Sequence, residues 1–365
     1  MTVSAPLTAA ALREHASDFQ VYEQQLALEL GGLSGLQINE LTFARLTKPD
    51  PLRLFGLDCD GEEVLMMGTD QRDMLVPKLA ETLRVLPPGG YVLDIGSGDG
   101  QTTSYALEGR SEPLSLVPLD PMKDSLQRYR DLFRSRHPKI SVPRVIASGI
   151  DELIEAQIAN PGTLPEYFHA VISAHSIYFS SNAPGFLSFA LDRLHPGGKL
   201  LLVYAEGLGR FTGAMTLGYL EKYGLDPEGK ERRSQKALDQ MIGLANGTLS
   251  RSDCQASLQK ALARNDFRIA EVMRQPTRIY GHDLGDMIAF AFINKLPMID
   301  QNLTRQIAYV SEPLQESPDV FDLRVHVSGP RARMFSLAQP QLFLAVEKLQ
   351  LLAGRKIDLV AVHSQ

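Results

Sequence analysis

The chain has 365 residues, 44% of them hydrophobic and 22% charged, with a formal net charge of −6 at pH 7. These proportions are ordinary for a globular protein. The acidic balance leaves no basic surface for nucleic acid, and no apolar run approaches the about 20 residues that span a bilayer. We therefore expect neither nucleic acid nor a membrane as a partner, and the oligomeric state stays open.

The cysteines and the N-terminus bear on the compartment. Cys59 and Cys254 show neither a CxxC motif nor Cys/His ligand spacing, and "MTVSAPLTAAALREHASD" lacks the basic start and apolar core of a secretory signal. Unpaired thiols in a reducing, cytoplasmic compartment fit this pattern.

Residues 1–85 are expected to form an N-terminal cap. "DFQVYEQQLALEL" has apolar residues at helical spacing, which predicts helices up to about residue 47. Two strand-like runs then flank Asp60-Gly61, a dipeptide that favours a tight hairpin turn. A further helix, "DQRDMLVPKLAETLRVL", ends at the Pro-Pro-Gly-Gly run that begins at Pro87.

From residue 86 onward strand-like and helical segments alternate, which predicts βαβ crossovers and a mainly parallel sheet. We interpret 86–365 as one α/β domain in which a polar, helical insert, 208–264, acts as a lid over the acceptor. The expected strands are "YVLDIG", "LSLVPLD", "RVIAS", "HAVISAH", "KLLLVYAEG" and "FRIAEVMRQ".

The last strand has two candidates. Either "QLFLAVEK" or "KIDLVAVH" can close the sheet, because 340–354 also fits a helix with proline near its start and glycine past its end. The sequence favours "KIDLVAVH" slightly.

The most informative stretch is "YVLDIGSGDGQTT", in which Asp94 ends a strand and Gly96, Gly98 and Gly100 follow. A strand-to-helix turn without side chains lets a polar ligand approach backbone N–H groups. The third glycine of a dinucleotide motif is replaced by Gln101, and no P-loop lysine is present.

The ends of the next two strands carry further polar residues. Asp120 follows "SLVPL", where its carboxylate can accept both hydroxyls of a ribose. Ser148 and Asp151 follow "RVIA" and are predicted to lie near an adenine. Because ligands of open parallel sheets bind beyond the carboxyl ends of the strands, these side chains should surround one nucleoside.

This arrangement resembles the class I S-adenosylmethionine (SAM) methyltransferases over residues 91–205. The resemblance implies a Rossmann-like fold with a seven-stranded, mostly parallel sheet, and SAM as the cofactor. The residues expected at the cofactor are Asp94, Gly96, Ser97, Gly98, Asp120, Ser125, Ser148, Asp151 and Ala174.

Within that class the sequence resembles histamine N-methyltransferase and related small-molecule enzymes. The matching segments are "LDPMKDSLQRYRDLF", "HAVISAHSIYF", "LEKYG" and "HDLGDMIAFAF". The resemblance implies that Asp70 helps to hold an amine substrate, and that His175 and Phe179 replace a glutamine and a tyrosine at the acceptor. A late asparagine of that family falls near Gln339 only if "QLFLAVEK" is the last strand.

Methyl transfer needs an acceptor lone pair about 3 Å from the activated methyl group, aligned and shielded from water. If the acceptor arrives protonated, His175 can accept the proton, since a free imidazole has a pKa of about 6.5. Tyr178 and Phe179 can place a ring near a cation, and Glu206 faces the same mouth from the end of a strand. His175 and Tyr178 are thus the expected catalytic residues.

The leading hypothesis is methyl transfer to a nitrogen of a small amine or imidazole-like metabolite, with transfer to oxygen or carbon still open. A second is a cyclase that converts SAM to azetidine-2-carboxylate and methylthioadenosine. A third is a SAM-binding protein without catalysis. No metal is expected, because His282, Asp283 and Asp286 lack a further ligand.

Overall fold

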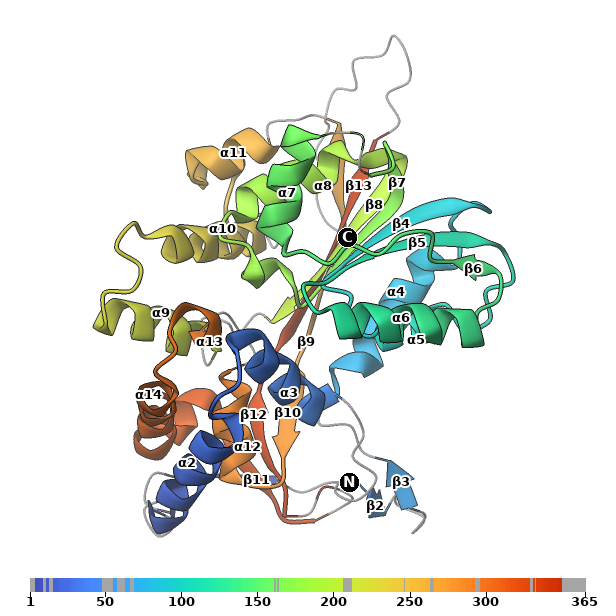
Figure 1. The fold of residues 1–365 in the computed structure, drawn as a ribbon. Helices are drawn as coiled ribbons and strands as arrows, with labels where there is room; N and C mark the ends of the chain where they lie inside the picture. The colour runs from blue at the N-terminus through green and yellow to red at the C-terminus, as the bar shows by residue number, and fades with distance from the viewer. Residues whose placement is uncertain are drawn as a thin grey trace.

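The computed structural model describes residues 4–8, 11–12, 16–47, 55–57, 63–65, 69–160, 162, 164–205, 212–245, 247–262, 266–292, 296–328, 331 and 333–349. Two bodies lie one above the other in Figure 1, each built around its own sheet. Within the described part of the chain, no helix is both long and apolar enough to cross a bilayer.

The upper body is built around a seven-stranded sheet in the order β6-β5-β4-β7-β8-β13-β9. All neighbouring strands from β6 to β8 run parallel, whereas β13 runs antiparallel to both β8 and β9. This confirms the mostly parallel sheet of a Rossmann-like methyltransferase fold. The strands are β4 (Gly90–Ile95), β5 (Leu114–Leu119), β6 (Ile140–Ser141), β7 (Phe168–Ala174), β8 (Leu194–Ala205), β9 (Phe267–Gln275) and β13 (Gln341–Lys348).

Helices cover both faces of this sheet, which explains why its strands read as nearly continuous apolar runs. In β4, Leu93 and Ile95 pack toward one face, while Val92 packs toward the other. The first face carries α7 (Ile150–Ala159), α8 (Ala183–Asp192), α10 (Lys230–Ala245) and α11 (Ala256–Leu262). The second carries α4 (Gln71–Leu83), α5 (Gln101–Ala106) and α6 (Lys123–Arg136).

The lower body is built around an antiparallel sheet in the order β1-β11-β12-β10, which the sequence did not predict. Its strands are β1 (Ser4–Pro6), β10 (Arg278–Gly281), β11 (Arg324–His326) and β12 (Phe335–Ala338). Its helices are α2 (Ala16–Leu30), α3 (Gly35–Thr47), α9 (Thr212–Lys222), α12 (Leu284–Phe290), α13 (Leu296–Ile299) and α14 (Leu303–Glu316). Segments from the N-terminal part of the chain and from residues 278–338 thus share this body.

Side-chain caps set where several helices begin. Asn182 accepts a hydrogen bond from the Gly185 N–H at the start of α8 (3.0 Å), and Asn302 does the same for Arg305 N–H in α14 (3.1 Å). Such caps satisfy N–H groups that have no partner inside the helix.

The predicted hairpin is confirmed, but the third strand of the large sheet is not where the sequence placed it. β2 (Phe55–Leu57) and β3 (Glu63–Leu65) pair antiparallel. β6 lies at Ile140–Ser141, and of "RVIAS" only Ile146 forms a bridge, to Leu119. Pro143 separates the two, and a proline cannot donate to a strand ladder.

The closing strand is also different from the one slightly favoured. "QLFLAVEK" is β13, and hydrogen bonds on both of its edges make it a strand rather than a helix. The segment "KIDLVAVH" lies outside the described residues. Gln339 therefore comes just before the last strand of the sheet.

Candidate cofactor and acceptor site

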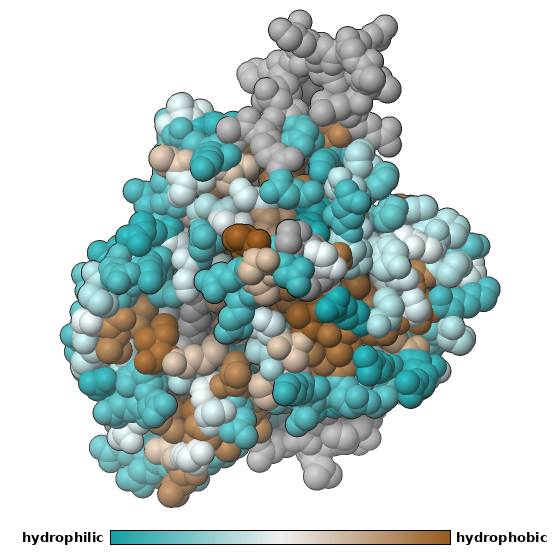
Figure 2. All heavy atoms as spheres, turned by 45° about the horizontal axis from the view of Figure 1, so that its top comes forward, coloured by the Kyte–Doolittle hydropathy of each residue, from teal (hydrophilic) through white to brown (hydrophobic). Residues whose placement is uncertain are grey.

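A cavity of about 550 Å³ opens at the carboxyl ends of β4, β5 and β7 and is closed from below by α3, α12 and α13. This volume lies within the range of small-molecule sites. The face drawn in Figure 2 has apolar residues gathered near its middle and hydrophilic residues around them. Because β4, β5 and β7 belong to the upper body and α3, α12 and α13 to the lower body, the cavity walls come from both bodies.

The glycine turn forms one wall of the cavity, and its three glycines differ in what a Cβ atom would meet at each position. Gly96, Gly98 and Gly100 all have positive φ, of 66°, 53° and 80°. A Cβ on Gly96 would lie 2.3 Å from Ser176 Cβ, and one on Gly100 would lie 2.5 Å from Tyr129 Cδ2. A Cβ on Gly98 would meet no atom within 4 Å, so this glycine alone faces open space.

Asp94 lies beneath that turn, where it is buried. Its Oδ2 accepts hydrogen bonds from Thr103 Oγ1 (2.7 Å) and Tyr129 Oη (3.0 Å). Burial raises the pKa of Asp94 to about 6, although both hydrogen bonds lower it. This carboxylate braces the turn from inside.

Asp120 stands at the end of β5, facing the turn. Its Oδ2 accepts the Gly98 N–H at 3.0 Å and its Oδ1 accepts the Met122 N–H at 2.9 Å. Burial raises its pKa, and the two N–H donors lower it. The carboxylate is therefore fixed in direction, as a residue that holds a ribose must be.

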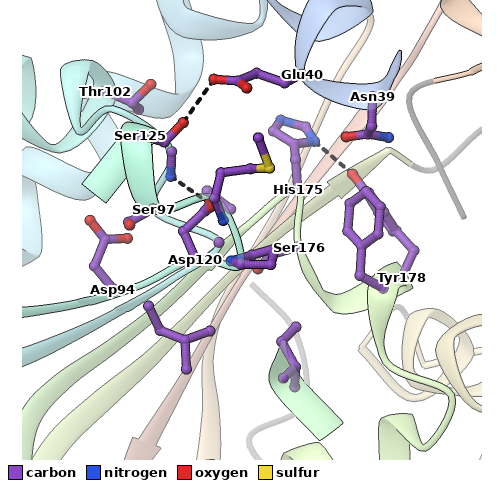
Figure 3. Close-up of a pocket in the computed structure, with 18 of the residues that line it drawn as sticks. Asn39, Glu40, Asp94, Ser97, Thr102, Asp120, Ser125, His175, Ser176 and Tyr178 are labelled. Atoms are coloured by element: carbon purple, nitrogen blue, oxygen red, sulfur yellow. Dashed lines mark hydrogen bonds between the residues drawn. The ribbon is translucent and has the colours of Figure 1, made fainter. Parts of the chain in front are cut away.

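Glu40, which the sequence analysis missed, reaches the same region from α3. Its Oε1 accepts from Ser125 Oγ at 3.0 Å, as Figure 3 shows. The same atom accepts from Arg128 Nη2 at 2.5 Å, and both donors lie on α6. Ser125 is thus placed at the cavity, and α3 is tied across it. No signal in the sequence alone links residue 40 to residue 125, since their contact arises only when the two bodies meet.

Of the two residues predicted to lie near an adenine, one lines the cavity and the other does not. Asp151 lines the cavity and accepts from Ser180 Oγ (2.5 Å) and from the Ser181 N–H (2.8 Å). Ser148 is not among the cavity-lining residues, and its hydroxyl donates to Gly149 O at 3.2 Å.

His175, Tyr178 and Phe179 line the cavity beyond Ala174, at the end of β7. His175 Nδ1 and Tyr178 Oη are 2.7 Å apart (Figure 3). Burial lowers the pKa of His175 to about 4, so the ring is neutral at pH 7. A buried imidazole is a weaker base than a free one, and the role of His175 as a proton acceptor stays a prediction.

Two polar atoms on the cavity wall have no hydrogen-bond partner among the described residues. These are the buried Ser97 Oγ and Gln339 Oε1. Both residues line the cavity, where a ligand can supply the partners. The Arg72 guanidinium also lines the cavity and lies over the Tyr105 ring, 6.0 Å from its centroid; burial lowers its pKa, while the charge of Asp99 raises it.

One expected substrate residue, Asp70, is not brought to this wall. Asp70 accepts from the Arg278 N–H (2.7 Å) and from Tyr280 Oη (3.2 Å), which joins α4 to β10, and it is not among the lining residues. Glu206 lies outside the described residues. The predicted lid contributes Glu231, while α10 and α11 pack mainly against α8.

The acids considered for a metal have other partners. Asp283 Oδ1 accepts the Asp286 N–H at the start of α12, and Asp286 Oδ2 accepts the His282 N–H. No group of three or more His, Cys, Asp or Glu side chains within the described ranges could hold a metal ion.

No model of a known protein family matches the sequence. A highly reducing polyketide synthase of Fusarium mangiferae is 28% identical over 227 residues, which cover 59% of this chain and 9% of that protein. The chain therefore corresponds to only a small part of this relative's length.

Several solved structures are similar. One is a candidate methyltransferase of Bacillus halodurans, at 19% identity and a TM-score of 0.42, covering 75% of this chain and 99% of that one. The YcgJ protein of Bacillus subtilis is 14% identical, with a TM-score of 0.41, covering 76% and 99%. The cyclopropane synthase MmaA2 of Mycobacterium tuberculosis is 14% identical, with a TM-score of 0.38, covering 84% and 93%. The fold assignment made here rests on the strand order, and the resemblance to histamine N-methyltransferase stays a prediction.

Proposed function

We propose that the protein transfers a methyl group from SAM to a small-molecule acceptor. The observation that carries the proposal is the pairing of Gly98, whose Cα faces open space, with the fixed carboxylate of Asp120. Bound SAM would supply a methyl group on a sulfonium, already activated for displacement. The chain's own residues bind it, align the acceptor and exclude water.

The residues present fit each part of SAM. The turn at Gly96 and the Ser97 hydroxyl, which has no partner among the described residues, suit its amino-acid part, whose carboxylate could pair with the Arg72 guanidinium on the same cavity wall. Asp120 suits the ribose, and Asp151 lies toward the base. On this proposal, the predicted cofactor residues that line the cavity contact the amino-acid part, the ribose and the base in turn.

The acceptor is a metabolite on this proposal, and a nitrogen acceptor has to arrive as a neutral amine or imidazole. Burial lowers the pKa of His175, which makes its imidazole a weaker base toward an ammonium group than a free imidazole. The relative named as a polyketide synthase also supports a small molecule rather than a macromolecule as the acceptor.

The proposal is tested by calorimetry with SAM and with S-adenosylhomocysteine. Asp120→Ala is expected to weaken binding about 10- to 100-fold, because hydrogen bonds to a charged group contribute about 1.5–3 kcal/mol. Asp124→Ala removes an exposed acid from the same region and serves as the matched control. Equal affinities for the two variants and the wild type would contradict the proposal.

Product analysis separates the alternatives. Methyl-labelled SAM is incubated with the protein, with and without a metabolite extract. Label in an acceptor, with S-adenosylhomocysteine formed only when the extract is present, is the expected result. Methylthioadenosine formed from SAM alone would instead identify the cyclase, and binding without either product a non-catalytic protein.

A further inference from the structure

The upper and lower bodies have separate apolar interiors. Among the described residues, the large buried clusters of the upper body contain side chains of the seven-stranded sheet and of the helices that cover it. The clusters of the lower body contain side chains of its own sheet and helices, and none of these clusters spans both bodies. Parts of a chain that share no large apolar interface are expected to move relative to each other.

A two-stranded ribbon connects the bodies, because β9 continues into β10 and β12 continues into β13 (Figure 1). The register of the β9–β13 pair passes into that of the β10–β12 pair without a shift, which places Pro276 opposite Pro340 and Thr277 opposite Gln339. Neither proline can donate a hydrogen bond to a third strand. In the described chain β8 pairs with β13 only as far as Ala205. The ribbon is therefore two strands wide where it leaves the upper body.

Hydrogen bonds keep the ribbon paired at this narrow level. The Gln339 N–H donates to Thr277 O at 2.8 Å, and Thr277 Oγ1 donates to Gln339 O at 2.5 Å. Both residues are buried, and Gln339 also lines the cavity. On the lower side, Thr69 forms a bridge to Ile279. A narrow segment that stays fully bonded can bend without coming apart, as a hinge must.

A second contact between the bodies also lies on the cavity wall, at Glu40 of α3. Its Oε1 accepts from Ser125 Oγ at 3.0 Å, as drawn in Figure 3. The same oxygen accepts from Arg128 Nη2 at 2.5 Å. The side chains of Glu40 and Arg128 are 29% and 46% exposed, so water competes for this ion pair. The contact can therefore open at little cost, whereas the buried hydrogen bonds of the ribbon cannot.

A third link, the loop 223–229 between α9 and α10, also permits movement. Gly224 and Gly229 in this loop have positive φ, of 64° and 63°. The ion pair that joins the two helices, Arg232 to Glu221 at 3.1 Å, is 64% and 69% exposed. Such an exposed pair adds little stability, so this loop does not hold the bodies in one position.

We propose that the two bodies form a clamp around the cavity, with the ribbon at Pro276 and Pro340 as its hinge and Glu40 as its latch. The cofactor enters and leaves by separation of α3 from α6. Bound cofactor holds the clamp shut, because both bodies supply walls of its site and contact it together only in the closed state. Closure excludes water, which methyl transfer requires. This deepens the proposed function and rests on it for the identity of the ligand.

The hinge is tested first without any ligand. Spin labels are attached at Leu33→Cys, just before α3, and at Arg134→Cys, near the end of α6, in protein whose native thiols are removed by Cys59→Ser and Cys254→Ser. Electron–electron double resonance measures the distance between the labels. Glu40→Ala should increase the mean Leu33–Arg134 distance by more than about 2 Å, because the latch is lost.

Two controls separate hinge motion from other effects. Glu29→Ala removes an acid from α2 of the same body and should leave the distance unchanged. Labels at Arg134 and at the exposed Val85, both in the upper body, should keep their distance in Glu40→Ala. The proposal is overturned if Glu40→Ala leaves the Leu33–Arg134 distance as it is, if Glu29→Ala changes it equally, or if the pair within the upper body moves as well.

Closure by the cofactor is tested next with S-adenosylhomocysteine, whose binding is followed separately by calorimetry. Saturating ligand should return the Leu33–Arg134 distance of Glu40→Ala to within about 2 Å of the wild-type distance, because ligand contacts replace the latch. Binding without this return overturns the proposal. If calorimetry detects no binding, the proposed function has failed, and the comparison without ligand still decides whether the ribbon is a hinge.

Discussion

At the scale of single residues, Asp94 shows how burial changes chemistry. Its side chain is 3% exposed, and the same Oδ2 atom accepts from both Thr103 and Tyr129. Burial raises its pKa to about 6, well above the 3.8 of a free aspartate, and the charge of Asp120 raises it further. The native state therefore binds this proton more tightly than the unfolded state does.

This difference predicts a pH-dependent stability. Between about pH 4 and 6 the Asp94 carboxyl holds more protons in the native state, so its contribution to the free energy of unfolding should fall by about 3 kcal/mol as the pH rises through this range. Asp94→Asn cannot titrate, and its amide oxygen can accept the same two hydrogen bonds.

The measurement is urea denaturation of wild type and Asp94→Asn at several pH values from 4 to 7. The wild type should be most stable relative to the variant below pH 4 and should lose that advantage above pH 6. Asp124→Asn, the same change at an exposed position, is the control. A difference between wild type and Asp94→Asn that is constant with pH would contradict the buried carboxyl described here.

At the scale of elements, the glycine turn combines packing and ligand binding in one segment. Gly100 lies against the Tyr129 ring, whereas Gly98 faces open space in the cavity. Both have positive φ, so alanine at either position costs about 1–2 kcal/mol in backbone strain.

We expect Gly98→Ala and Gly100→Ala to fail in different ways. Gly98→Ala should stay folded, at a cost of about 1–2 kcal/mol, and bind S-adenosylhomocysteine at least about 10-fold more weakly, since its methyl group enters the cavity. Gly100→Ala should lose more stability, because the new Cβ would lie 2.5 Å from Tyr129 Cδ2. Thermal unfolding and calorimetry measure the two effects, and equal losses of stability would disprove the distinction.

Helix α3 is tied across the cofactor region by the pairing of Glu40 with Arg128. The Arg128 side chain is 46% exposed, so the ion pair contributes at most about 0.5–1 kcal/mol. Arg128→Ala should speed dissociation of S-adenosylhomocysteine about two- to five-fold in stopped-flow experiments. Arg134→Ala removes the same charge from an exposed position of α6. If Arg134→Ala speeds dissociation of S-adenosylhomocysteine as much as Arg128→Ala does, the role assigned to Glu40 and α3 is wrong.

At the scale of the whole molecule, the lower body joins the N-terminal segment to strands and helices between residues 278 and 338. β1 pairs with β11, and residues of α2 pack with α12 and α14 in one buried cluster. The division into a cap at 1–85 and a domain at 86–365 remains a proposal, and these contacts predict that the two parts unfold together.

Helix α2 provides a matched pair for testing this. Phe19 is fully buried in the cluster, whereas Leu28 is 83% exposed. Phe19→Ala should cost about 3–5 kcal/mol and lower the midpoint of a single unfolding transition, while Leu28→Ala should change it little. Denaturation followed by circular dichroism distinguishes these results. Two separate transitions in Phe19→Ala would show instead that the cap unfolds on its own.

Much of the fold followed from local pattern. Apolar runs of strand length, separated by helices, predicted the parallel sheet, and β4, β5, β7, β8 and β9 lie where the sequence placed them. The third strand and the lower sheet did not follow, because β6 has two residues and β1 has three. Segments so short carry little periodicity, and their pairing depends on strands far away in the chain.

The sequence by itself determined the turn at Gly96–Gly100 and the acid at Asp120, because glycine conformation and the ends of strands are local properties. Only the tertiary structure decided that Glu40 reaches Ser125, that Gln339 lines the cavity and that burial lowers the pKa of His175. These effects arise from elements that come together from distant parts of the chain. Such effects exist only once the chain has folded.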